Sequence, residues 1–157
     1  KSDVDLVMNL QGDEPLIDIE DVNNLNNQMK KSNSDLGTLA AKIQNKDLFE
    51  KQNVVKVITD ESLDKFQFPQ AVNFYRQKKN IVENTYHHLG IYCYRLETLT
   101  KFVSLKQSQK EIENKLEQLR ALDNNIKINV ALAKKSSIGV DTKEDFVAIK
   151  KIMEYKS

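Results

Sequence analysis

The sequence predicts an α/β fold with a mixed, mostly parallel β-sheet flanked by helices. Short apolar runs typical of buried strands alternate with segments whose apolar residues recur at helical spacing. The chain has only 4 Gly and 2 Pro among 157 residues, which suits interleaved strands and helices. With 39% apolar and 30% charged residues, and without a repeat or low-complexity linker, residues 1–157 are expected to form one domain.

The first half of the chain is expected to contain four strands and one long helix. Residues 6–10 form an apolar run typical of a buried strand. Asp18 is expected to cap a helix with an apolar stripe formed by Ile19, Val22, Leu25 and Met29. Further strands are predicted at 36–43, 54–59 and 66–75, with a helical turn at 47–51. Pro69 makes the strand at 66–75 a bent or edge strand.

The second half begins with a polar, mobile loop at 76–85, followed by an aromatic and β-branched strand at 88–94. A short helix is predicted at 96–103. Ser108 and Glu111 match a capping box, and the helix that they open places Ile112, Leu116 and Leu119 on one face. The remaining predicted elements are a strand at 126–133, a loop at 134–140, and a helix from Thr142 to about Tyr155.

Charge and cysteine content narrow the possible functions. The net charge of +1 provides no general attraction for nucleic acid or for acidic membranes. No apolar stretch approaches the roughly 18 to 20 residues that span a bilayer, and no signal peptide is recognisable. Cys93 is the only cysteine, so a reducing cytoplasm is expected. Because the chain lacks an initiating Met and enters its first strand almost at once, we expect a piece of a longer polypeptide.

Two acidic loops are candidates for a metal site. Gln11, Gly12, Asp13, Glu14 and Pro15 follow the first strand, and Asp141 lies just before the last helix, close to Gly139. Two carboxylates from separate loops could hold one divalent ion such as Mg²⁺ and leave positions for phosphate. The alternatives are a surface turn around Asp13 and a simple helix cap at Asp141.

Other polar residues have weaker signals. In the 88–94 strand, His88, Gly90, Tyr92 and Tyr94 share one face that could line a pocket, although a lone His is more often structural. Glu117 and Gln118 flank an apolar helical stripe and could equally be solvated. No glycine-rich phosphate loop or nucleophile motif is present, and too few His and Cys residues occur for a zinc site.

Six stretches, taken in order, resemble the CMP-Kdo synthetase family, the 3-deoxy-manno-octulosonate (Kdo) cytidylyltransferases of lipopolysaccharide biosynthesis. The stretches are 9–17 (NLQGDEPLI), 53–57 (NVVKV), 74–76 (FYR), 88–95 (HLGIYCYR), 116–120 (LEQLR) and 139–145 (GVDTKED). The resemblance covers about the C-terminal three fifths of such an enzyme and implies a nucleotide-diphospho-sugar transferase-like fold. The family's N-terminal nucleotide-binding loop has no counterpart here.

The resemblance implies Mg²⁺-dependent transfer of CMP from CTP to the anomeric hydroxyl of Kdo, in a cytoplasmic homodimer. The implied metal ligands and catalytic residues are Asp13 and Asp141. The implied sugar-acid pocket consists of Gln11, Arg76, His88, Tyr92, Glu117 and Gln118. Arg76 would pair with the sugar carboxylate through its planar guanidinium, and the others would hydrogen-bond the hydroxyls.

Two alternatives to this function stay open. Tyr75 stands where the family has a small residue, and no Pro or Trp follows Arg76 as it does in the family. The substrate could therefore be another acid, such as sialic acid or an amino analogue of Kdo. The chain could also be a non-catalytic fragment that binds a sugar acid or dimerises, and we expect weak or no CTP binding by these 157 residues alone.

Overall fold

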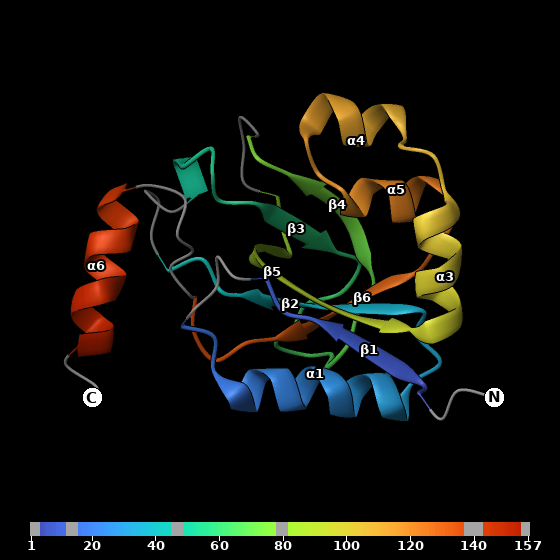
Figure 1. Ribbon diagram of the computed structural model, residues 1–157, viewed down its shortest axis with the longest axis horizontal. Helices are drawn as coiled ribbons and strands as arrows, with labels where there is room; N and C mark the ends of the chain where they lie inside the picture. The colour runs from blue at the N-terminus through green and yellow to red at the C-terminus, as the bar shows by residue number, and fades with distance from the viewer. Residues whose placement is uncertain (1–3, 12–15, 45–48, 78–81, 137–142, 155–157) are drawn as a thin grey trace.

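The computed structural model describes residues 4–11, 16–44, 49–77, 82–136 and 143–154. The strands are β1 (Leu6–Asn9), β2 (Leu36–Ala41), β3 (Lys56–Thr59), β4 (Ala71–Tyr75), β5 (Thr85–Arg95) and β6 (Ile128–Leu132). The helices are α1 (Ile19–Lys31), α3 (Leu96–Ser104), α4 (Gln109–Asn114), α5 (Gln118–Asp123) and α6 (Lys143–Glu154). The described strands form a sheet, and helices α1, α3 and α5 pack against it (Figure 1).

The long strand β5 organises the sheet. The strand order is β4-β3-β5-β2-β6, and β1 pairs with β5 outside this path. The first part of β5 pairs with β3 through residues 85–87, and its last part pairs with β1 through residues 92–95. Because β5 contacts three strands, residues on it lie beside segments that are far apart in the sequence.

The predicted mixed sheet flanked by helices is confirmed, but the expectation that it is mostly parallel is wrong. Among the described strands only β2 and β6 pair in parallel, whereas β5 is antiparallel to β1, β2 and β3, and β3 is antiparallel to β4. The strands β1 and β2 are joined through α1 and run in the same direction, as a helical crossover predicts. However, β5 comes from later in the chain and lies between them in the opposite direction.

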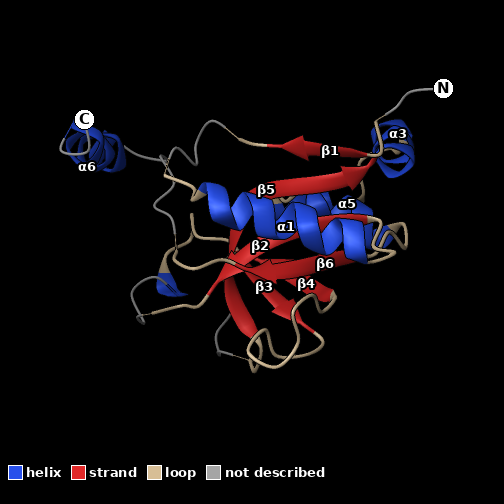
Figure 2. Cartoon of the chain, turned by 90° about the horizontal axis from the view of Figure 1, so that it is seen from below, coloured by secondary structure: helices blue, strands red, loops and turns tan. Residues whose placement is uncertain are grey.

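Both faces of β5 are buried, because alternate residues of the strand enter two different cores. On one face, Leu89, Ile91 and Cys93 pack with Leu25 and Met29 of α1. The other face carries Tyr92 and Tyr94 toward residues of α3 and α5, which cover the sheet opposite α1 (Figure 2). This second face, which was predicted to be able to line a pocket, is largely packed in the core, since His88, Tyr92 and Tyr94 are 5%, 7% and 6% exposed.

The helix α1 begins and ends as its sequence predicts. Asp18 caps the helix by accepting a hydrogen bond from the Glu20 backbone at 2.9 Å. Val22, Leu25 and Met29 are buried as expected, but Ile19 is 67% exposed, so its assignment to the buried stripe is wrong. The first turn is too close to the end of the sheet for every residue at helical spacing to reach the core.

The single helix predicted after Ser108 is two helices. The capping box is confirmed, because the Ser108 side chain accepts from the Glu111 backbone and Glu111 accepts from the Ser108 backbone. Helix α4 then ends at Asn114, and Lys115 adopts a left-handed conformation with φ of 53°. This turn leaves Ile112 exposed, whereas Leu116 and Leu119 enter the core. The predicted common face of these three residues is therefore wrong.

The remaining predicted elements are present, with shifted ends. The strand predicted at 54–59 begins at Lys56, and the strand predicted at 66–75 begins after Pro69 and lies at one end of the strand order, as an edge strand should. The aromatic strand β5 begins earlier than predicted, at Thr85. The short helix after it and the strand β6 are also confirmed. The turn at 47–51 and the loops at 76–85 and 134–140 lie partly outside the described residues.

Gly37 allows α1 to lie close to β2. A Cβ atom at this position would lie 2.8 Å from Met29 Sδ, 2.9 Å from Leu25 Cδ1 and 3.0 Å from Phe68 Cζ. Gly37→Ala is therefore expected to lower the free energy of unfolding by about 1–3 kcal/mol, because buried side chains must leave their preferred positions. Urea unfolding followed by circular dichroism measures this loss.

Gly90→Ala is the matched control, since among the described residues a Cβ atom at Gly90 would meet only the flexible end of Gln11, with Oε1 at 3.0 Å and Cδ at 3.6 Å. We expect its cost to be the smaller of the two. An equal or larger loss for Gly90→Ala would contradict the tight α1–β2 packing as the cause.

Candidate functional site

The first acidic loop leaves the sheet beside the middle of β5. Gln11 follows β1, and its side-chain oxygen lies against Gly90, where a larger residue would collide with it. Asp18, which caps α1, marks the other end of this loop. Asp13 itself lies outside the described residues, so its position remains a prediction.

The second acidic loop begins beside His87, three residues from Gly90 along β5 and on the opposite face of that strand. His87 of β5 makes a hydrogen bond between Nδ1 and the Ser136 hydroxyl. The Lys134 backbone donates to both carboxylate oxygens of Asp21, at 3.1 and 3.2 Å, and Lys134 Nζ lies 3.8 Å from Asp18 Oδ2. Asp141, which follows later in this loop, lies outside the described residues.

The two loops therefore share two anchoring regions, one on β5 and one at the start of α1. Burial raises the pKa of Asp21, and the hydrogen bond from the Lys134 backbone opposes that shift. Residues 4–11, 16–44, 49–77, 82–136 and 143–154 contain no group of three or more His, Cys, Asp or Glu placed to hold a metal ion. Asp13 and Asp141, the predicted metal ligands, lie outside these residues.

Arg76 connects two segments at the edge of the sheet. Its guanidinium donates to the Asn53 carbonyl at 3.2 Å and to the Lys115 carbonyl at 3.4 Å. Lys115 forms the turn between α4 and α5, so Arg76 lies close to the start of α5, where Glu117 and Gln118 are found. The structure therefore places Arg76 beside the turn that precedes Glu117 and Gln118, which follow it by about 40 positions in the sequence.

Glu117 and Gln118 differ in their surroundings. The Glu117 side chain is 60% exposed and lies 3.7 Å from Arg120, whereas Gln118 is buried. The alternative prediction, that both residues are solvated, therefore holds for Glu117 but not for Gln118, which is buried. A buried carboxamide beside an exposed carboxylate offers a polar ligand both donors and acceptors.

His88 and Tyr92 lie deeper than a pocket-lining role predicts. His88 is 5% exposed, its ring contacts Phe74 edge-on at 5.0 Å, and it lies 5.6 Å from the Tyr92 ring. Burial lowers the pKa of His88 to about 3, with a further contribution from His87. The imidazole is consequently neutral at physiological pH, with one N–H donor and one bare nitrogen.

Lys56 was not among the predicted site residues, yet its ammonium group holds the backbone of Arg76. Lys56 is 1% exposed, and Nζ donates to the carbonyls of Arg76 and Lys51, both at 2.7 Å, with the Phe49 ring 5.6 Å away. Burial, and then the charge of Arg76, lower the pKa of Lys56 to about 8. The available signal was a lysine inside the apolar run of a predicted buried strand, where a charge requires an explanation.

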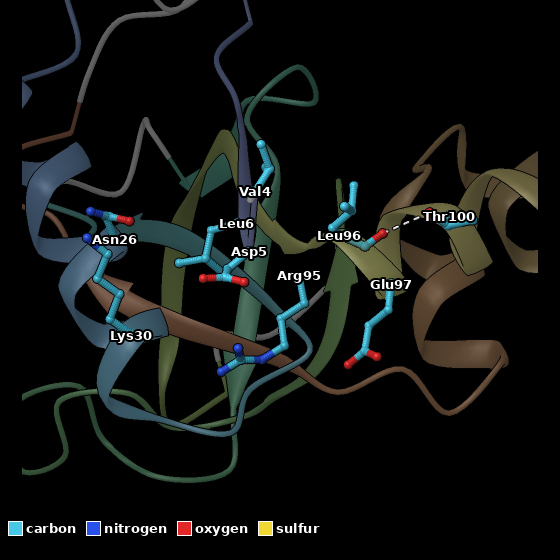
Figure 3. Close-up of a pocket in the computed structure, with 9 residues that line it drawn as sticks. All are labelled: Val4, Asp5, Leu6, Asn26, Lys30, Arg95, Leu96, Glu97 and Thr100. Atoms are coloured by element: carbon cyan, nitrogen blue, oxygen red, sulfur yellow. Dashed lines mark hydrogen bonds between the residues drawn. The ribbon is translucent and has the colours of Figure 1, made fainter. Parts of the chain in front are cut away.

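A separate surface cavity lies at the opposite end of β1 from Gln11. It is lined by residues from α1, the start of β1 and the start of α3, including Asp5, Lys30 and Glu97 (Figure 3). Arg95, which also lines the cavity, already has partners at the end of α1, because its guanidinium donates to the carbonyls of Met29 and Ser32 at 3.2 and 2.6 Å. None of the predicted site residues lines this cavity.

Solved structures similar to this one place the fold among the nucleotidyltransferases. The inositol-1-phosphate CTP transferase from T. maritima matches 98% of this chain and 56% of its own with a TM-score of 0.59 and 13% identity, a likeness of fold alone. A solved CMP:2-keto-3-deoxy-manno-octonic acid synthetase complexed with CTP is much more similar. It matches 99% of this chain and 64% of its own, with a TM-score of 0.83 and 29% identity.

The chain belongs to the cytidylyltransferase family, whose sequence profile matches residues 1–128. A 3-deoxy-manno-octulosonate cytidylyltransferase from Thermodesulfovibrio yellowstonii is 42% identical over 94% of this chain and 60% of the relative. One of the same name from Pectobacterium carotovorum is 36% identical over 97% of this chain and 64% of the relative. The resemblance seen in the sequence is thereby confirmed, and the chain spans about three fifths of the length of these relatives.

No helix in the part of the chain that the structure describes combines the length and the apolar character needed to cross a bilayer.

Proposed function

We propose that this chain forms the sugar-acid and metal-binding part of an enzyme that transfers CMP from CTP to Kdo, for lipopolysaccharide biosynthesis in the cytoplasm. The observation that carries this proposal is the TM-score of 0.83 over 99% of the chain with a CMP:2-keto-3-deoxy-manno-octonic acid synthetase complexed with CTP. The names of the 36–42% identical relatives support the same reaction.

In this proposal, the residues at the edge of the sheet bind and orient the sugar acid. Arg76, held by Lys56 and by the α4–α5 turn, pairs with the carboxylate. The sugar hydroxyl groups form hydrogen bonds with Gln11, Glu117 and Gln118. His88 and Tyr92 are further hydrogen-bond partners that lie deeper in the protein. The oriented anomeric hydroxyl attacks the α-phosphate of CTP, and pyrophosphate leaves. Positioning and electrostatic stabilisation provide most of the rate in such transfers.

Asp13 and Asp141 would hold Mg²⁺, which neutralises charge on the phosphates when it is bound. Two carboxylates fit the usual protein share of a Mg²⁺ site that also takes phosphate oxygens. The anchors of the two loops, Gly90 and His87, are about 10 Å apart along β5 and lie on opposite faces of the strand. Asp13 comes two residues after Gln11 and Asp141 five after Ser136, so extended chain of at most about 7 and 17 Å is enough to bridge that gap.

A metal titration tests the acidic pair without requiring turnover. Mn²⁺, used as a paramagnetic substitute for Mg²⁺, should broaden the backbone NMR signals of both Gln11 and Ser136. Asp13→Asn and Asp141→Asn should each weaken the effect at least about tenfold, because each removes a direct ligand. Asp5→Asn, which changes an exposed acid at the start of β1, is the control. Broadening at only one of the two loops would contradict a shared ion.

The substrate is tested by calorimetry with a panel of sugar acids. Kdo should bind, and sialic acid and an amino analogue of Kdo should bind more weakly. Preference for one of those acids would favour the second candidate, for which Tyr75 beside Arg76 is the supporting observation. The proposed division of roles would be contradicted if the chain bound CTP as tightly as a complete site does and bound none of the acids.

A non-catalytic fragment that binds a sugar acid or dimerises is the other candidate. The homodimer expected from the family is tested by sedimentation, and a monomer at all concentrations would contradict it.

A further inference from the structure

The Thr38 hydroxyl lies at the centre of a buried polar cluster behind the proposed sugar-acid pocket. Thr38 is fully buried in β2, and its Oγ1 lies 2.7 Å from the Ile91 carbonyl, 2.9 Å from His88 Nε2 and 3.4 Å from the Leu89 carbonyl. A hydroxyl that contacts three polar groups in a core is expected to fix the direction of each hydrogen bond.

An irregularity in the sheet creates this cluster. Thr38 pairs with Tyr92, but its neighbour Leu39 pairs with Leu89, so Gly90 and Ile91 have no counterpart in β2. The Ile91 carbonyl instead accepts a hydrogen bond from the Thr38 side chain. Irregularities of this kind often occur beside functional sites, where they redirect side chains.

The number of available protons decides which nitrogen of His88 carries hydrogen. The Thr38 hydroxyl has one proton, and carbonyls can only accept, so the short contact assigns that proton to Ile91. Thr38 Oγ1 must then accept from His88 Nε2, which therefore carries the N–H. Because burial keeps the pKa of His88 near 3, the ring is neutral and Nδ1 is bare.

We propose that Thr38 is a positioning residue that holds His88 as the neutral Nε2–H tautomer, so that Nδ1 acts as a hydrogen-bond acceptor for a sugar hydroxyl. This inference deepens the proposed function and rests on it. A bare nitrogen accepts from a hydroxyl but repels a carboxylate, whereas the Arg76 guanidinium attracts a carboxylate and has no acceptor for a hydroxyl proton. The two residues would thus fix the orientation of an acid that carries both groups.

Three variants test this role. Thr38→Val removes the hydroxyl at almost constant shape, and Thr38→Ser restores it. Thr59→Val is the matched control, because Thr59 is also buried and donates to the Glu61 carbonyl at 2.7 Å but lies beyond the residues of β3 that pair with β5. The chain has only 2 His, so nitrogen NMR of the folded chain reads the tautomer of His88 directly.

We expect His88 to be the Nε2–H tautomer in the wild type and in Thr38→Ser, and a mixture of tautomers in Thr38→Val. Calorimetry should show the affinity for Kdo falling about fivefold to tenfold in Thr38→Val, because one well-placed hydrogen bond to the sugar is lost. Thr38→Ser and Thr59→Val should bind Kdo as the wild type does.

An Nδ1–H tautomer in the wild type would overturn the inference whatever the ligand data show. Unchanged Kdo affinity in Thr38→Val would also overturn it. If the wild-type chain binds no sugar acid of the panel, the proposed function fails and the ligand part of the inference fails with it, whereas the NMR result still decides the role of Thr38 toward His88.

Discussion

Lowering the pH from 7.5 to 4.5 should remove roughly 5 kcal/mol from the free energy of unfolding, through His87 and His88 alone. Burial lowers the pKa of His87 to about 4, assisted by the charge of Lys56, and lowers the pKa of His88 to about 3. In the unfolded chain both side chains return to their ordinary value of 6.5. The unfolded state therefore binds more protons below pH 6.5, and stability falls as the pH decreases toward the folded values.

The effect is measured by urea unfolding at a series of pH values. A double variant, His87→Gln with His88→Gln, removes both titrating groups and keeps hydrogen-bonding side chains in their places. Its stability should change much less between pH 7.5 and 4.5, so the slopes are compared rather than the absolute stabilities. The folded wild type provides a second measurement, because its two His ring signals should not titrate between pH 5 and 7.5. Titration near 6.5 would show that the rings are accessible to water.

The local features of the fold were predictable from the sequence. Asp18 and Ser108 cap helices as expected, because a cap depends on residues within one turn. The strands also fall close to their predicted positions, because apolar runs report burial. The Lys115 turn was missed, since the apolar stripe continues through it and only the packing of Leu116 and Leu119 against the sheet shows the break.

Features that depend on distant contacts were not predictable. Which strand lies beside which is decided by the whole chain, and the insertion of β5 between β1 and β2 has no local signal. The contact between Arg76 and the α4–α5 turn is of the same kind, although both segments were selected by resemblance. Thr38 and Lys56 could only have been noticed as polar residues inside apolar runs, without any indication of their partners.

Replacing Glu111 with Ala should lower the free energy of unfolding by roughly 3–5 kcal/mol, the usual cost of removing one partner of a buried ion pair. Glu111 is 4% exposed and accepts from Arg120 in a two-point arrangement, Nε to Oε2 at 2.8 Å and Nη2 to Oε1 at 2.5 Å. The hydrogen bonds from Arg120 lower the pKa of Glu111, against the effect of burial. The same carboxylate also accepts hydrogen bonds from the Ser108 backbone N–H and the Gln107 side-chain amide, both at 3.2 Å.

The loss combines two events in different helices. The start of α4 loses half of its capping box. The Arg120 guanidinium of α5, which lies 4.8 Å above the centre of the Phe102 ring, is left without its buried carboxylate partner. Glu113→Ala is the control within α4, because Glu113 is exposed and its carboxylate accepts a hydrogen bond from the exposed Gln109 side chain at 2.7 Å. Its cost should stay below about 1 kcal/mol. Equal losses for the two variants would contradict a buried, structural role for Glu111.

The double variant Glu111→Leu with Arg120→Met separates charge from packing, because two apolar residues of similar volume remove the unpaired charge. It should recover part of the stability lost in Glu111→Ala. The ion pair holds α4 against α5 on either side of Lys115, whose carbonyl accepts from Arg76. Loss of Glu111 should therefore also weaken Kdo binding in the proposed site, measured by calorimetry below the unfolding temperature. Affinity that stays unchanged while stability falls would show that Arg76 is positioned by Lys56 and Asn53 without help from the turn.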